Sequence, residues 1–66
     1  MDIQLNGEPR QLADGGSIAD LLQIEHLAQR RVAVEVNGEI VPRSQHAIRV
    51  LAEGDRVEIV HALGGG

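Results

Sequence analysis

The sequence contains no cysteine, no lysine and no phenylalanine, tyrosine or tryptophan, and each absence excludes some chemistry. Without cysteine there is no disulfide framework, no thiolate nucleophile and no cysteine-based zinc site. Without aromatic rings the chain lacks the surfaces on which folds that bind single-stranded nucleic acid stack the bases. Without lysine it has no side-chain amine. The six basic residues are all arginines, whose guanidinium groups stay protonated and are not nucleophilic.

Size and charge narrow the possibilities further. A chain of 66 residues forms one domain and buries roughly 60% of the surface that its unfolded form exposes, which leaves no room for a deep catalytic cleft. The net charge of −4 repels a phosphate backbone. No apolar run approaches the ~20 residues that span a bilayer, and the N-terminus lacks the basic start of a signal peptide. We therefore expect a soluble, cytoplasmic protein that binds neither nucleic acid nor membrane.

The first half of the chain predicts a hairpin followed by a short helix. Hydrophobic and polar residues alternate over residues 1–5, as in an edge or central strand with one buried face. Asn6-Gly7 favours a tight turn, so residues 9–12 should return antiparallel. Ser17, with an aspartate three residues later, resembles a capping box and predicts a helix from Ile18 to Ile24.

The second half predicts another hairpin and a final strand. Valines of one parity in residues 32–36 precede the turn dipeptide Asn37-Gly38. Pro42 ends the pairing because it has no amide hydrogen to donate. The remaining expected elements, in chain order, are a short strand at 39–41, an irregular turn at 44–46, a tight turn at 53–55 and a strand around Val57 and Ile59.

This order of elements predicts an α+β fold. One helix that connects two hairpin regions favours a mixed sheet packed on that helix, which is the β-grasp (ubiquitin-like) architecture. Residues 1–66 form a single domain in this interpretation, and residues 61–66 form a flexible glycine-rich tail.

Residues that could carry catalysis are few and have structural explanations. The three histidines lie in separate segments without metal-site spacing, so no metal site and no catalytic residue are predicted. They are His26, His46 and His61. Ser17 is better explained as a helix N-cap, and Ser44 lies in a turn. Gly15-Gly16 lacks the lysine and the spacing of a phosphate-binding P-loop, which favours a corner that leads into the helix.

The three glycines at the end of the sequence allow two interpretations. Terminal glycines are often no more than a frayed end. However, the residues from His61 onward could reach about 20 Å at ~3.3 to 3.6 Å per residue, enough to enter the active site of another protein. Glycine has no Cβ and can pass through a narrow channel. A terminal glycine carboxylate activated as an acyl adenylate cannot racemise. The chain would then be a substrate of partner enzymes and not itself an enzyme.

Three segments carry a resemblance to a known family. They are Val36-Asn37-Gly38-Glu39-Ile40-Val41-Pro42-Arg43, Gly54-Asp55-Arg56-Val57-Glu58-Ile59-Val60 and Gly64-Gly65-Gly66. The chain resembles, over essentially its whole length, the ThiS family of sulfur carrier proteins in thiamine (thiazole) biosynthesis. The Gly-Asp turn and the Gly-Gly end are shared with the small subunit of molybdopterin synthase and with ubiquitin-like modifiers. The Val-Pro-Arg segment resembles the thiamine carriers more specifically.

The resemblance implies a role for the end of the tail. Gly66 would be adenylylated by a ubiquitin-activating-type (ThiF-like) enzyme that uses ATP and magnesium. It would then become a thiocarboxylate with sulfur from a cysteine desulfurase relay. Gly64 and Gly65 would be the narrow spacer. The sulfur would pass to a thiazole synthase (ThiG-like), and the chain itself would bind no cofactor.

Residues beside the tail could form an apolar docking surface. The candidates are Val60, Ala62 and Leu63, and ordinary packing in the core or at the strand end is an equal alternative for Val60. Two other functions stay open. One is the sulfur-carrier subunit of molybdopterin synthase, and the other is a non-covalent β-grasp interaction module with an inert tail. The absence of lysine suits an activated C-terminus, but it also fits an arginine-biased genome.

Overall fold

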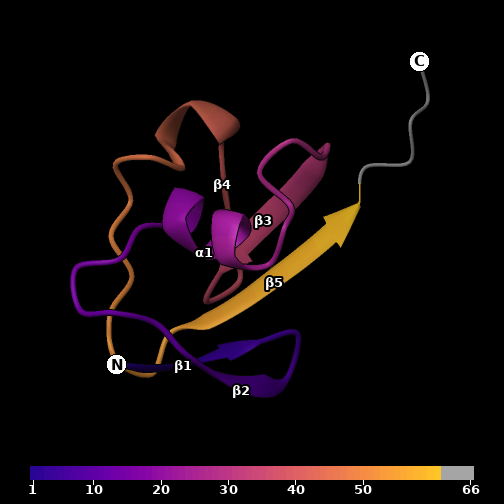
Figure 1. Ribbon diagram of the computed structural model, residues 1–66. Helices are drawn as coiled ribbons and strands as arrows, with labels where there is room; N and C mark the ends of the chain where they lie inside the picture. The colour runs from indigo at the N-terminus through magenta and orange to yellow at the C-terminus, as the bar shows by residue number, and fades with distance from the viewer. Residues whose placement is uncertain (62–66) are drawn as a thin grey trace.

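Two hairpins and a final strand build one five-stranded sheet (Figure 1). The computed structural model describes residues 1–61. The elements in chain order are β1 (Asp2–Leu5), β2 (Glu8–Gln11), α1 (Ile18–Ile24), β3 (Val32–Val36), β4 (Glu39–Val41), the 3₁₀ helix η1 (Arg43–Gln45) and β5 (Arg56–His61). Both predicted hairpins, the helix and the final strand are therefore confirmed.

Two asparagine-glycine pairs make the hairpin turns. Asn6 and Gly7 have φ values of 51° and 82°, and Asn37 and Gly38 have φ values of 52° and 87°. Two successive residues with positive φ form the type I′ turn, whose twist matches that of the flanking strands. Each pair therefore connects two adjacent antiparallel strands.

The strand order is β2-β1-β5-β3-β4, which places the last strand in the middle of the sheet. β5 runs parallel to β1, and it runs antiparallel to β3 with Val34 opposite Ile59. The sheet is mixed, as predicted. Residues 1–5, for which an edge or a central position was open, form an interior strand.

α1 begins at the predicted capping box. The Ser17 hydroxyl accepts a hydrogen bond from the Asp20 amide at 3.1 Å, and the Asp20 carboxylate accepts one from the Ser17 amide at 2.9 Å. These contacts satisfy two amides at the N-terminal end, where helical partners are absent.

The end of α1 depends on His26, which the sequence analysis considered only as a metal ligand. His26 has a φ of 62°, and the Leu27 amide donates to the Leu22 carbonyl at 2.7 Å. The His26 amide donates to the carbonyl of Gln23. This is the Schellman arrangement, with histidine at the left-handed position that glycine usually occupies.

The core lies between α1 and one face of the sheet (Figure 1). It is entirely aliphatic, and every strand except β2 contributes to it. The buried residues are Ile3, Leu5, Leu12, Ile18, Leu21, Leu22, Val34, Val36, Val41, Leu51, Val57 and Ile59. Burial of each such side chain stabilises the fold by ~1.5 to 3 kcal/mol before the entropic cost is subtracted.

Two sequence predictions need correction. The irregular turn expected at 44–46 is a turn of 3₁₀ helix over Arg43–Gln45, because the amides of Gln45 and His46 donate to carbonyls three residues earlier. The tail was expected to begin at His61, but β5 includes His61, which is opposite Val32 in the register.

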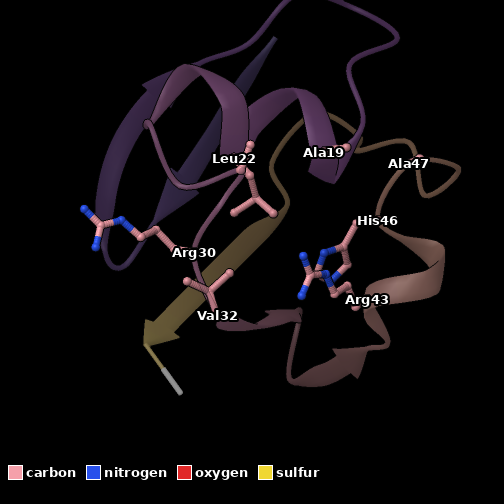
Figure 2. A pocket seen from close by; sticks show the side chains of 8 residues that line it. Ala19, Leu22, Arg30, Val32, Arg43, His46 and Ala47 are labelled. Carbon is pink, nitrogen blue, oxygen red and sulfur yellow. The ribbon is translucent and has the colours of Figure 1, made fainter. Parts of the chain in front are cut away.

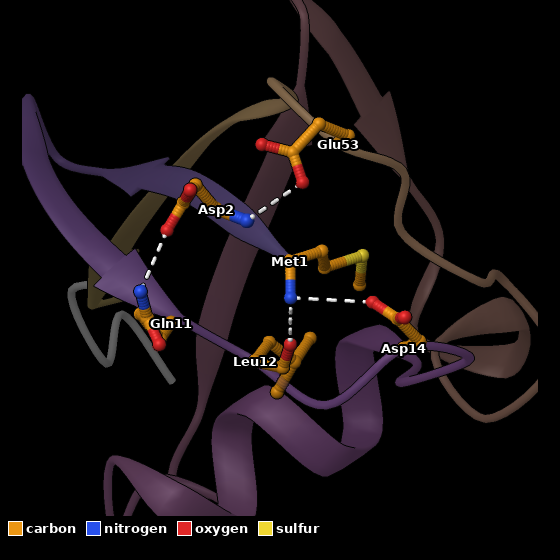
Figure 3. A network of polar contacts seen from close by, with 6 residues as sticks. All are labelled: Met1, Asp2, Gln11, Leu12, Asp14 and Glu53. Atoms are coloured by element: carbon orange, nitrogen blue, oxygen red, sulfur yellow. Dashed lines mark hydrogen bonds and ion pairs between the residues drawn. The ribbon is translucent and has the colours of Figure 1, made fainter.

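A polar network joins β1 to two loops (Figure 3). The Met1 ammonium donates to the Leu12 carbonyl at 2.8 Å and lies 3.2 Å from an Asp14 carboxylate oxygen. The Asp2 amide donates to the Glu53 carboxylate at 3.0 Å. These contacts hold β1 between the segment that leads into α1 and the turn before β5.

Candidate functional site

The central strand β5 is the part of the described structure from which the glycine-rich end of the sequence continues. Five residues of β5 pair with β3, from Val57 opposite Val36 to His61 opposite Val32. β1 pairs with the other edge of β5 at Arg56 and Val57. The chain thus reaches residue 62 from a strand that hydrogen bonds hold on both sides.

Asn6 extends the contact between the first hairpin and β5. Its side-chain oxygen accepts a hydrogen bond from the Ile59 amide at 2.8 Å, and its side-chain nitrogen donates to the Ile59 carbonyl at 3.3 Å. The Asn6 amide donates to the Val57 carbonyl at 2.9 Å. The Asn6 side chain therefore acts as a short additional strand partner where β1 has ended. The sequence analysis explained Asn6 only as a turn residue and missed this contact.

Val60 lies on the face of the sheet opposite α1. It is 59% exposed, so core packing, one of its two interpretations, is wrong. Ala33 lies directly opposite Val60 in the register. Ile40 of β4, 72% exposed, lies on the same face opposite Glu35, two residues further along β3. We call Ala33, Ile40 and Val60 the outer patch.

The other predicted site residues lie outside the described residues. They are Ala62 and Leu63 of the expected docking surface, and Gly64, Gly65 and Gly66. The structure therefore describes β5, the strand after which these residues follow in the sequence, and one docking candidate, Val60.

The residues that the sequence analysis set aside have structural roles. Ser17 caps α1, and Ser44 lies in η1. Gly15 has a φ of +83°, and a Cβ on Gly16 would lie 2.8 Å from the Leu12 side chain. The two glycines thus form the corner before α1. Within residues 1–61, no three histidine, aspartate or glutamate side chains gather as a metal site would require.

His46 is a buried polar residue that sequence reasoning did not place. Its side chain is 6% exposed, and its ring Nε2 lies 3.0 Å from the Val41 carbonyl oxygen. The contact fixes η1 against the end of β4. No periodicity in the sequence indicated it, because His46 follows a 3₁₀ turn.

A cavity of about 200 Å³ opens beside His46, between α1 and η1 (Figure 2). We call it the helix-side cavity. Its lining combines small apolar side chains with two arginines. The lining residues are Ala19, Leu22, Ala28, Arg30, Val32, Arg43, His46 and Ala47. They come from three separate segments, 19–22, 28–32 and 43–47, which is why no local motif predicted the cavity.

No helix in the described part of the chain is long and apolar enough to cross a membrane.

Comparisons with known proteins match the whole chain. The family model described as ThiS family matches residues 3–66. A sulfur carrier protein ThiS from Bacillus subtilis is 40% identical over 65 residues, which cover 97% of this chain and 98% of that protein. The crystal structure of a thiamine biosynthesis protein (ThiS) from Geobacter metallireducens superposes with a TM-score of 0.81 at 34% identity and covers 100% of both chains. This match confirms the predicted β-grasp fold.

Some relatives are much longer. A thiazole synthase from Magnetococcus marinus is 42% identical over 66 residues, which are 100% of this chain and 20% of that protein. The chain thus spans about a fifth of the length of the thiazole synthases that it matches. The family match over residues 3–66 and the near-complete coverage of the Bacillus relative lead to one conclusion: this chain belongs to the ThiS family.

Proposed function

We propose that this chain is a sulfur carrier protein of thiamine biosynthesis that carries sulfur as a thiocarboxylate on Gly66. The observation that carries the proposal is the family match, which runs through the terminal glycines and includes a relative named as a sulfur carrier. It favours the thiamine carrier over the molybdopterin carrier, which was the alternative with the same chemistry.

The reaction on the tail needs three substitutions. First, a Gly66 carboxylate oxygen attacks the α-phosphorus of ATP, and pyrophosphate leaves. The outer sulfur of a persulfide on the desulfurase relay then attacks the acyl carbon, and AMP leaves. A thiol attacks the relay sulfur of the resulting acyl disulfide, which releases the thiocarboxylate and leaves a disulfide between the thiol and the relay. The net result is that one carboxylate oxygen is replaced by sulfur. A carboxylate with a pKa of ~3.5 is ionised and unreactive at neutral pH, so the chain depends on the ATP of a partner enzyme.

The composition of the chain suits this chemistry. An acyl adenylate reacts with amines and thiols, and the sequence contains neither lysine nor cysteine. Its six arginines provide cationic side chains that do not attack an activated acyl group.

Three kinds of partner follow from the proposal. A ThiF-like adenylyltransferase with ATP and magnesium activates Gly66, and a cysteine desulfurase relay supplies the sulfur. A ThiG-like thiazole synthase accepts the sulfur, and the occurrence of this domain within longer thiazole synthases supports that partner. The chain acts as a co-substrate of these enzymes in the cytoplasm.

The outer patch is the proposed docking surface on the sheet side. Val60 is two positions before Ala62 in the sequence. Its exposed side chain lies beside that of Ala33 on the neighbouring strand β3. Exposed aliphatic side chains that lie together favour contact with another protein. Ala62 and Leu63 extend this surface along the chain in our proposal, with Gly64 and Gly65 as the narrow spacer before Gly66.

Reconstitution tests the proposed reaction. The purified chain is incubated with the adenylyltransferase, the desulfurase, cysteine, a thiol reductant, ATP and magnesium, and its intact mass is measured. We expect the mass to increase by the difference between sulfur and oxygen, and omission of ATP should prevent the increase. An unchanged mass with all components present, while a ThiS carrier of another species is converted in the same mixture, would contradict the proposal.

A further inference from the structure

The helix-side cavity lies at the same end of the sheet as the end of β5. Val32, which lines the cavity, is opposite His61 in the register. Arg43 begins η1, two residues after Val41, and lines the same cavity as Val32. Arg30 is two residues before Val32. Both arginines of the cavity therefore lie near the point at which the chain continues toward Gly66.

The guanidinium groups of Arg30 and Arg43 are free to bind an anion. The guanidinium groups of Arg30 and Arg43 make no hydrogen bond or ion pair with any of residues 1–61, and both residues are exposed. By contrast, Arg10 is paired with Glu8 and Glu25. Two unpaired guanidinium groups beside one cavity form a local positive region in a chain whose net charge is −4. Guanidinium groups match carboxylates in geometry and charge.

The floor of the cavity is apolar and rigid. Leu22 of α1 and Val32 of β3 form it, and both pack in or against the core. His46 is held by its contact with the Val41 carbonyl. In Figure 2, Arg43 lies toward His46, and Arg30 leads outward from the opposite rim beside Val32. The cavity thus offers an apolar floor with the Arg43 guanidinium beside it and the Arg30 guanidinium turned outward at its rim, and its volume of about 200 Å³ suits one or two side chains.

We propose that the helix-side cavity is a docking site for an acidic side chain of the thiazole synthase that accepts the tail. The carboxylate would pair with Arg43, its aliphatic stem would lie on Leu22 and Val32, and Arg30 would contact the adjoining acidic surface. This inference rests on the proposed function, in which thiazole synthase holds the tail. The longer relatives named as thiazole synthases, which contain a region similar to this chain, favour that enzyme over the adenylyltransferase as the occupant.

The length of the tail supports a protein occupant. Residues 62–66 span at most about 18 Å when fully extended. An enzyme that holds Gly66 in its active site must therefore bring its own surface close to His61, and hence close to Val32 and the cavity rim. An acidic rim on that enzyme would be steered toward the arginines and would fix the orientation of the carrier.

Binding to thiazole synthase tests the inference. The affinity of the chain for the synthase of the same organism is measured by calorimetry at low and moderate salt. Arg43→Gln should raise Kd about tenfold or more and should weaken the salt dependence. Arg56→Gln is the matched control: Arg56 is also exposed, and its guanidinium group has no partner in residues 1–61, but it lies at the other end of β5. It should change Kd by less than about twofold.

A second variant tests the cavity without changing charge. Ala47→Leu adds volume at an exposed lining position and should raise Kd severalfold while thermal unfolding is unchanged. Equal affinities of Arg43→Gln and Arg56→Gln, or a wild-type chain that does not bind the synthase, would overturn the inference. Thiocarboxylate formation, measured separately on the same variants, decides the proposed function: it should equal that of the wild type even where synthase binding is lost.

Discussion

Ile59 and Val60 are neighbours in β5, but they lie in opposite environments. Ile59 is 7% exposed and belongs to the core beneath α1, whereas Val60 is 59% exposed on the outer patch. The comparison separates two roles along one strand. The inner face holds the sheet on the helix, and the outer face exposes the side chain of Val60. Substitutions on the inner face of β5 should therefore change the free energy of unfolding, whereas changes on the outer face or after His61 should change the interaction with partner enzymes.

The largest effect should come from the tail. Deletion of Gly65 and Gly66 together should abolish thiocarboxylate formation, because the chain would end as Leu63-Gly64 without its Gly-Gly terminus. Thermal unfolding should not change, since the core lies within residues 3–59. Deletion of a single glycine is the control, because the chain still ends in Gly-Gly and should still accept sulfur. Mass spectrometry and calorimetry on the same samples check both results.

The next effect concerns the two sides of β5. Ile59→Ala should lower the free energy of unfolding by ~2 to 5 kcal/mol because it leaves a cavity in the core. Val60→Ala should change it by less than about 0.5 kcal/mol, since the side chain is largely exposed. Urea unfolding measures both. If Val60→Ala were the more destabilising change, the assignment of the two faces would be wrong.

A smaller effect should follow from loss of the Asn6 contacts with β5. Asn6→Gly keeps a residue that tolerates the φ of 51°, but it removes the two side-chain hydrogen bonds to Ile59. We expect a loss of ~1 to 3 kcal/mol. Hydrogen exchange should show faster exchange of the Ile59 amide, which loses its acceptor. Asn37→Gly at the equivalent turn is the matched substitution, and it should leave exchange at Ile59 unchanged.

The smallest effect should be a gain in stability. His26→Gly places glycine at a position with a φ of 62°, where a side chain is unfavourable, and should stabilise the fold by up to about 1 kcal/mol. Because His26 is far along the chain from β5, thiocarboxylate formation should stay at the wild-type level. Loss of stability in this variant would show that the histidine side chain contributes more than its backbone conformation costs.

Local signals predicted much of the fold. Asn6-Gly7 and Asn37-Gly38 fixed both hairpins because adjacent residues alone determine a type I′ turn. Ser17 and Asp20 marked the beginning of α1 for the same reason. The predicted helix bounds, Ile18 to Ile24, agree with the structure.

The features that were missed depend on contacts between distant segments. The Asn6 side chain meets Ile59 across 53 positions, and no local pattern contains that information. His61 belongs to β5 because Val32 provides its partner, although its own neighbours suggested the start of a tail. Likewise, three segments must fold together before Arg30 and Arg43 line one cavity. The sequence pattern predicted the helix and the strands. The proposed docking surfaces combine residues from distant segments, so they could be seen only in the folded structure.

The central claim is that Gly66 carries sulfur in the cell. The most direct measurement is intact-protein mass spectrometry of the chain isolated from cells starved of thiamine, with the partner enzymes present. Our account predicts a population that is heavier by the exchange of one oxygen for sulfur, with the added mass located on the C-terminal fragment. A chain that stays entirely unmodified under starvation would contradict it.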